Sequence, residues 1–300
     1  TPTLSSAASD VYKRQLYRSI VRDISELDVF SPIREPFRNF AREVCDRKKK
    51  ILLISQPNIT GALAIAPIEA ALLDSGLPYR RRFTNQSPDS ETFVHVAEDS
   101  GKGRTSNDGI VISEFVVEGL RGSSGDSRKG PLCTVAQAHF LATEINPSSE
   151  RLRRLRPWIL SGNWVGDSLD RAYDPVYSFL RDYLSEQGVI RVVPVTEVKS
   201  PESGNYPWIE DTELWRVTDL WQTSNLEKRE RIMGELAMPI FGSKVPSTTR
   251  VEELLWHCVI APNWESDLSS QIFRANSFWD TKKPVEAANE IADLLVSIGQ

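Results

Sequence analysis

The stretch from Lys50 to Phe83 constrains the fold of this chain more than any other. Residues 51–54 form an unbroken apolar run, which is typical of a strand buried on both faces, as in a parallel sheet. A polar, turn-rich segment follows, and then apolar residues recur at helical spacing until Gly76, a residue that suits a helix C-terminus. Residues 79–83 are predicted to form a second strand. The stretch therefore predicts a right-handed βαβ unit, with the loop after its first strand at the sheet edge where active sites gather.

The rest of the chain extends this unit into an α/β fold with a doubly wound, mostly parallel sheet over residues 16–199, followed by a smaller, mainly helical region over residues 200–300. The patterns predict further strands at 92–97, 109–115 and 189–195, and helices at 16–27, 36–47, 132–145, 150–160, 174–187, 213–221, 226–238, 249–259 and 284–298. The segment 200–207, rich in Pro, Gly and Ser, marks the candidate boundary, and the Gly- and Ser-rich segment 119–130 is predicted to be a surface loop. Residues 1–15 match no folding pattern, and we expect a non-native leader or a disordered tail there.

Charge and composition limit the function classes. The net charge is −5 and the pI about 5.5, which argues against non-specific nucleic-acid binding by the whole surface but leaves a local basic patch open. The run Arg80, Arg81 and Arg82 is the candidate nucleic-acid contact, although basic residues also protect exposed edge strands from aggregation. No apolar run approaches the roughly 18 residues of a membrane span, so we expect no membrane contact.

The cysteines, histidines and tryptophans add further limits. The three cysteines lie far apart and form no Cys-x-x-Cys pair, which favours a reduced, cytoplasmic setting. Only three histidines are present, and they are scattered, so no nucleophilic triad can be argued. Six of the eight tryptophans follow Ser200, where they fill either a helical core or an interface.

Four segments between Lys50 and Asp167 resemble, in order and rough spacing, the motifs of the DHH phosphoesterase superfamily, the group that contains the RecJ nucleases. The segment 57–61 stands where the family has a strand ending in Asp-Ala-Asp-Gly: Gly61 fits, but Asn58 and Ile59 replace the acids. Asp99 resembles the strand-closing Asp of the second motif, and Asp167 the Asp of the fourth. Each aspartate also has a purely structural explanation: Asp99 can be an ordinary turn residue, and Asp167 can cap the helix that follows it.

The third motif departs most from the family. The family has Asp-His-His there, and this chain has Glu114, Phe115 and Val116. The resemblance implies a site for two divalent metals, usually manganese, on clustered aspartates. Two metals about 3.5–4 Å apart need several anionic oxygens, and only Asp99, Asp167 and Glu114 are available here.

The resemblance therefore implies a catalytically inactive RecJ relative that needs no cofactor and acts as a scaffold in DNA replication. Such relatives include the non-enzymatic protein that joins the MCM ring and the GINS complex in archaeal and eukaryotic replicative helicases. The expected partners are replication proteins of the GINS and MCM kind, with single-stranded DNA as a further option.

Two alternatives remain open. The first is an active phosphoesterase or single-strand exonuclease with a reduced manganese or magnesium site on Asp99, Glu114 and Asp167, in which Asn58 orients the substrate. The second is an unrelated α/β binding domain, in which these acids are scattered rather than convergent. The glycine-rich, His-containing motif of the DHH-associated domain is absent before Gln300, so the chain is either truncated or has lost that domain.

Overall fold

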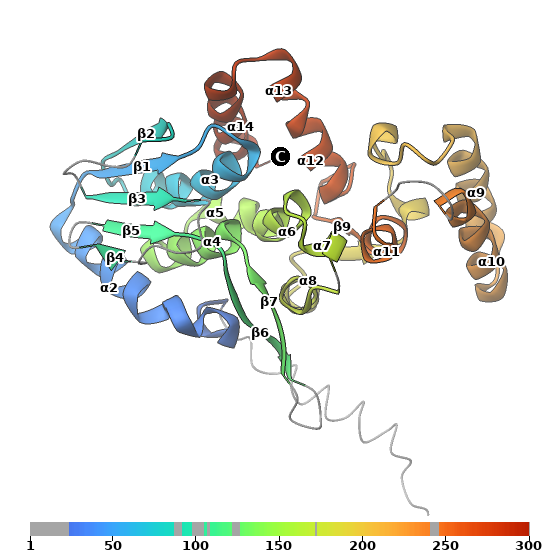
Figure 1. Ribbon diagram of the computed structural model, residues 1–300, viewed down its shortest axis with the longest axis horizontal. Coiled ribbons are helices and arrows are strands. Elements are labelled where there is room, and N and C mark those ends of the chain that lie inside the picture. Colours follow the sequence, from blue (N-terminus) through green and yellow to red (C-terminus); the bar gives the residue numbers. More distant parts are fainter. Residues whose placement is uncertain are drawn as a thin grey trace, which may run out of the picture.

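A five-stranded sheet lies toward one end of the computed structural model, which describes residues 24–86, 92–97, 105–106, 109–121, 127–171, 173–240 and 246–299 (Figure 1). Its strands are β1 (Ile51–Ser55), β2 (Tyr79–Phe83), β3 (Phe93–Val96), β4 (Thr105–Ser106) and β5 (Gly109–Ile112). They lie in the order β2-β1-β3-β5-β4, and all pairs are parallel except β4 with β5. The predicted α/β fold with a mostly parallel sheet is confirmed.

The strand order places a topological switch point beside the first strand. The chain leaves β1 through the helix α3 (Ile59–Asp74) to β2 on one side, and later returns to pair β3 with the other side of β1. This order is found in doubly wound sheets, which bind ligands outside the carboxyl ends of the strands where the order reverses.

Helix α3 is the central helix, because it is apolar on all sides and buried over almost its whole length. It packs on the sheet face that carries Ile51 and Leu53, and it contacts both α4 (Thr134–Ile145) and α14 (Pro284–Ile298). Helix α2 (Ser31–Arg47) packs against α4 in turn. On the opposite face of the sheet, Leu52, Ile54 and Phe93 form a small separate cluster.

A long hairpin leaves the sheet where the sequence predicts one strand and a loop. The predicted strand 109–115 is interrupted, and β6 (Phe115–Arg121) pairs with β7 (Ser127–Leu132). The hairpin lies against α8 (Pro175–Glu186) at two glycines, since a Cβ on Gly119 would lie 2.7 Å from the Pro175 backbone and one on Gly130 2.8 Å from Asp174 Oδ1. Part of the predicted surface loop 119–130 is therefore a packed strand.

Helices are present at the predicted segments 213–221, 226–238 and 249–259, whereas the helices at 161–165, 168–171, 268–276 and 278–281 were not predicted. The described end of the predicted helix 16–27 is a 3-10 helix. The predicted helix 150–160 is α5 (Glu150–Leu155) followed by a 3-10 helix, η3 (Arg156–Leu160), because Pro157 lacks the N–H that an α-helix needs. The others are α6 (Ser161–Val165), α7 (Ser168–Arg171), α9 (Asp211–Thr223), α10 (Leu226–Ala237), α11 (Thr248–Trp256), α12 (Leu268–Asn276) and α13 (Phe278–Thr281), with short 3-10 helices η1 (Ile24–Glu26), η2 (Asp28–Phe30), η4 (Val195–Glu197), η5 (Ser203–Asn205) and η6 (Met238–Ile240).

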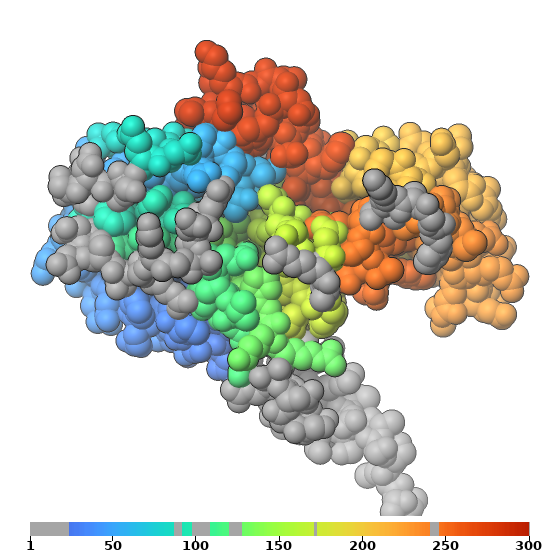
Figure 2. Space-filling model, viewed as in Figure 1, coloured from blue at the N-terminus to red at the C-terminus, as the bar shows by residue number. Residues whose placement is uncertain are grey.

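Segments on either side of the predicted boundary at residue 200 contact each other. Strand β8 (Arg191–Val193) pairs with β9 (Cys258–Ile260), a strand that falls partly within the predicted helix 249–259. Figure 2 shows the C-terminal residues, in red, lying directly on the blue and cyan part of the molecule, where α14 contacts α3 and β2. Among the helices described, none combines the length and the apolar character that crossing a bilayer requires.

Candidate functional site

The carboxyl ends of four parallel strands meet at one edge of the sheet. Ser55 at the end of β1 lies opposite Phe83 of β2 and Val96 of β3, and Val96 lies opposite Ile112 of β5. The loops that follow these strands therefore open on a common edge, with the switch point between β1 and β3. The sequence predicts that the segments resembling the metal-binding motifs, which lack several of the family's acids, lie at this edge.

Asn58 begins helix α3 at this edge. Its Oδ1 accepts a hydrogen bond from the Gly61 N–H at 2.8 Å, which satisfies one of the unpaired amides of the first helical turn. Gly61 is required because a Cβ there would lie 2.3 Å from the Gln56 carbonyl oxygen and 2.4 Å from Ser55 Oγ. Both motif positions therefore have a structural role in the tight turn from β1 into α3.

Internal contacts also occupy backbone groups of two loops at this edge. The Trp279 indole, from α13, donates to the Pro57 carbonyl oxygen at 2.9 Å. The buried Gln137 amide, from α4, donates to the Ser113 carbonyl oxygen at 2.7 Å, directly before Glu114. The strand-end loops thus connect the sheet to its helices, including a helix far along the chain.

The candidate acids do not form a metal site among the described residues. Glu114, between β5 and β6, and Asp167, at the bend between α6 and α7, are both exposed. Within the described ranges, no three His, Cys, Asp or Glu side chains lie close enough together to hold a metal ion. Asp99 lies outside the described residues, so a metal site that includes it stays a prediction.

The bend at Asp167 is held by a distant arginine. Arg250, from α11, donates from Nη1 to the Trp164 carbonyl oxygen at 3.0 Å and from Nη2 to the Gly166 carbonyl oxygen at 2.9 Å. Its Nε lies 2.9 Å from both carboxylate oxygens of Asp170. The segment that resembles the fourth motif is therefore anchored by its backbone to the C-terminal half.

A buried polar cluster lies beside this bend. Asn163 Nδ2 donates to Asp174 Oδ2 at 2.8 Å, and the Cys133 thiol donates to Asn163 Oδ1 at 3.3 Å. Asp174 Oδ1 in turn caps α8 by accepting from the Val176 and Tyr177 amides. Burial raises the pKa of Cys133 to about 12, so this thiol stays protonated near neutral pH and is a poor nucleophile.

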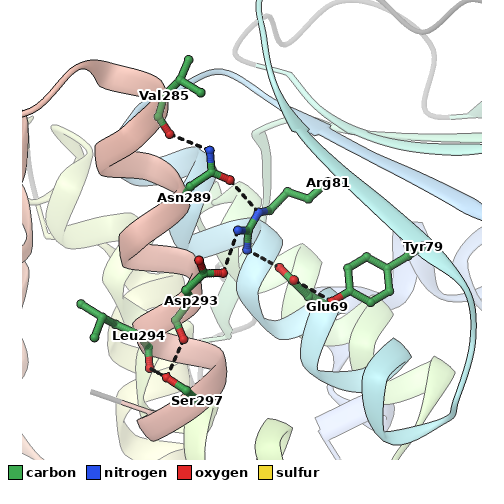
Figure 3. Close-up of polar contacts among 8 residues, drawn as sticks. All are labelled: Glu69, Tyr79, Arg81, Val285, Asn289, Asp293, Leu294 and Ser297. Carbon is green, nitrogen blue, oxygen red and sulfur yellow. Dashed lines mark hydrogen bonds and ion pairs between the residues drawn. The ribbon is translucent and has the colours of Figure 1, made fainter.

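The three arginines predicted to contact nucleic acid point in different directions. Arg81 faces α3 and α14 (Figure 3): its Nη1 donates to Glu69 Oε2 and its Nη2 to Asp293 Oδ1, both at 2.7 Å, and its Nε donates to Asn289 Oδ1 at 3.1 Å. The Tyr79 hydroxyl donates to the other oxygen of Glu69 at 2.7 Å. Burial opposes the charge of Arg81, but Glu69 and Asp293 outweigh it and raise its pKa.

This internal network leaves Arg81 poorly placed to bind nucleic acid, because its side chain is only 13% exposed and its donors already have partners. Arg80 and Arg82 are exposed on the opposite face of β2. Their predicted role in nucleic-acid binding stays a prediction.

Replacing Gly61 with alanine should destabilise the protein by about 1–3 kcal/mol, because the added methyl group forces the β1–α3 turn open. The matched control is Gly234→Ala in α10, where a Cβ meets no atom within 4 Å. That change should stabilise the protein by about 0.5–1 kcal/mol, since it removes glycine from a helix interior. Urea denaturation of both variants measures the difference, and equal effects would show that the turn tolerates a side chain.

A pocket of about 590 Å³ lies apart from the strand ends, between α12, α14 and the segment 263–266. Apolar side chains form much of its wall, including Trp158, Phe278 and Leu295. Its volume is typical of small-molecule sites. The guanidinium of Arg274 is bonded to Glu202, and the polar side chains of the lining include Asn263, Ser266 and Gln271.

Sequence reasoning missed the residues that organise this region, namely Asn163, Asp174, Arg250 and Trp279. Asp174 could have been recognised as a helix cap, because it stands directly before Pro175 at a helix start. Arg250 and Trp279 gave no local signal, since each acts on backbone carbonyl groups more than eighty residues away.

Comparisons with known proteins show a distant likeness to solved structures and no match in sequence. No protein-family model matches the chain, and no curated protein matches it in sequence. Among solved structures, the chain is similar to the crystal structure of CDC45 from Entamoeba histolytica, with 11% sequence identity and a TM-score of 0.46. The match covers 90% of this chain and 68% of that chain. A likeness at this level assigns no activity to the chain.

Proposed function

We propose that the chain is a catalytically inactive RecJ-like protein that acts as a scaffold in DNA replication. The observation that supports this proposal most directly is that the loop after β1 makes structural hydrogen bonds to two helices. Its Asn58 caps α3 through Gly61, and its Pro57 carbonyl oxygen accepts a hydrogen bond from Trp279. The position that would supply metal ligands in an active relative thus holds helices together instead.

The chemistry of the remaining groups supports the same reading. Asn58 offers a neutral oxygen that is already bonded, and Glu114 and Asp167 belong to no cluster of potential metal ligands among the described residues. A pair of divalent cations needs several anionic oxygens as ligands, and few anionic oxygens remain at this edge. A scaffold needs only the fold and an accessible surface.

The catalytic half of the proposal is tested with manganese and single-stranded DNA. We expect calorimetric titration with Mn²⁺ to show no saturable binding, and an end-labelled single-stranded oligonucleotide to stay intact under conditions in which a RecJ nuclease degrades it. Saturable Mn²⁺ binding with cleavage that Asp167→Ala abolishes would overturn this half. Asp46→Ala is the matched control, because Asp46 is an exposed aspartate on α2.

The scaffold half has its own test. The full chain is mixed with purified MCM and GINS assemblies from the same source and analysed by size-exclusion chromatography. We expect it to co-elute with at least one of them. Failure to co-elute with either would overturn the replication role, whatever the result with manganese.

A further inference from the structure

Helices α9 and α10 form a pair at the end of the molecule farthest from the sheet (Figure 1). The inner side of α9 packs against the rest of the protein through the buried side chains Leu214, Val217 and Trp221. Trp221 also contacts Trp256 of α11, with ring centroids 5.9 Å apart. Asp211, Trp215 and Asp219 of α9 lie outside this buried set.

The outer side of α9 has an exposed aromatic ring between two acids. Asp211, Trp215 and Asp219 follow one another at four-residue intervals, so they lie in one stripe about 12 Å long. All three are exposed, and Trp215 is 70% exposed, which is unusual for a residue that is highly buried on average. Exposed tryptophans are frequent anchors in protein interfaces.

Two arginines of the α9–α10 pair have other partners. Arg216 pairs with Glu213 and Glu235 on the neighbouring surface of the two helices. Arg229 lies over the Trp221 ring and donates to the Trp221 carbonyl oxygen at 3.0 Å. Within the part of the chain that the structure describes, neither the Asp211 nor the Asp219 side chain has an ion-pair or hydrogen-bond partner. The stripe thus consists of the Trp215 indole ring and, on either side of it along the helix, a carboxylate without an ion-pair partner among the described residues.

We infer that the stripe of Asp211, Trp215 and Asp219 binds a basic segment of a partner protein. A lysine or arginine of that segment lies over the Trp215 ring as a cation–π contact, and neighbouring basic side chains pair with the two aspartates. Basic residues at every fourth position of a helix match the spacing, because they repeat at the same rise along the partner helix.

Other classes of partner fit less well. Phosphate groups of nucleic acid or of a lipid surface would be repelled by the two carboxylates. A wholly apolar helix would remove the carboxylates from water without offering them partners. This surface is distinct from the strand-end loops, so the inference does not depend on whether the chain has catalytic activity.

The probe is a fluorescein-labelled, alanine-based helical peptide with arginine at every fourth position, and binding is followed by fluorescence anisotropy near physiological salt. We expect saturable binding to the full chain, about tenfold weaker binding to Trp215→Ala, and at least tenfold weaker binding to the Asp211→Asn/Asp219→Asn double variant. The same peptide with glutamate in place of arginine should not bind. Thermal unfolding of each variant confirms that the fold is retained.

The matched control is the Glu35→Gln/Asp46→Asn double variant, which removes the same two charges from exposed positions on α2, at the opposite end of the molecule (Figure 1). It should bind the arginine peptide within about twofold of the unaltered chain, because charge away from the stripe is largely screened. If this control and the aspartate variant weaken peptide binding equally, the effect comes from the net charge of the protein and the inference is overturned. Absence of binding to the unaltered chain, or unchanged binding to Trp215→Ala, would also overturn it.

Discussion

Replacing Arg81 with methionine is expected to lower the free energy of unfolding by about 3–5 kcal/mol. Methionine keeps most of the apolar stem but removes the guanidinium that pairs with Glu69 and Asp293. The side chain of Glu69 is 9% exposed, so its carboxylate would remain buried with only the Tyr79 hydroxyl as a partner in the network. Equilibrium denaturation in urea at pH 7 measures the loss.

Arg82→Met is the control for this experiment, because it makes the same change one residue along β2, on the opposite and exposed face. It should change the stability by less than about 0.5 kcal/mol. The double variant Glu69→Met/Arg81→Met should recover part of the loss, since it removes both buried charges together. If Arg81→Met and Arg82→Met behave alike, the network in Figure 3 contributes little to stability.

The second large effect is a loss of stability in mild acid that depends on His139. This residue is 2% exposed in α4, and its Nε2 is a buried atom without a hydrogen-bond partner among the described residues. Burial, together with the positive charge of Arg156, lowers the pKa of His139 from 6.5 to about 3. The unfolded chain therefore binds a proton below pH 6.5 that the folded chain does not bind until about pH 3, so folding is progressively disfavoured as the pH falls through this window.

At pH 4 this difference corresponds to a loss of about 3 kcal/mol relative to pH 7. His139→Leu should remove that part of the acid sensitivity and should cost little at pH 7, because it replaces an unpaired buried nitrogen with an apolar group. The unfolding free energies of both proteins at pH 7 and pH 4 provide the measurement. An equal loss in the two proteins would mean that other groups cause the acid sensitivity.

The elements of the sheet could be predicted where the sequence pattern is local and strong. The apolar run 51–54, the apolar helix after it and Gly76 predict β1, α3 and the turn to β2, because neighbours along the chain determine strand and helix patterns. The parallel pairing of β1 could be predicted because apolar and polar residues do not alternate in that run, which indicates a strand buried on both faces. These features depend on residues a few positions apart.

Elements whose stability comes from distant partners were missed or misplaced. Strand β7 lies in a Gly- and Ser-rich segment, and β9 follows directly on a helical pattern. Each becomes a strand because another strand pairs with it, β6 in one case and β8, some sixty-five residues earlier, in the other. Propensity along the chain does not contain that information.

The candidate site shows the same division. The sequence by itself determined that Asn58 and Ile59 stand where acids are expected, and that Gly61 follows them. Only the tertiary structure decided that Asn58 caps α3, that Trp279 binds the same loop, and that Arg81 reaches Asp293 across 212 positions of the chain. The physical reason is that residue types set which bonds a side chain can make, whereas packing of distant helices decides which of those bonds form.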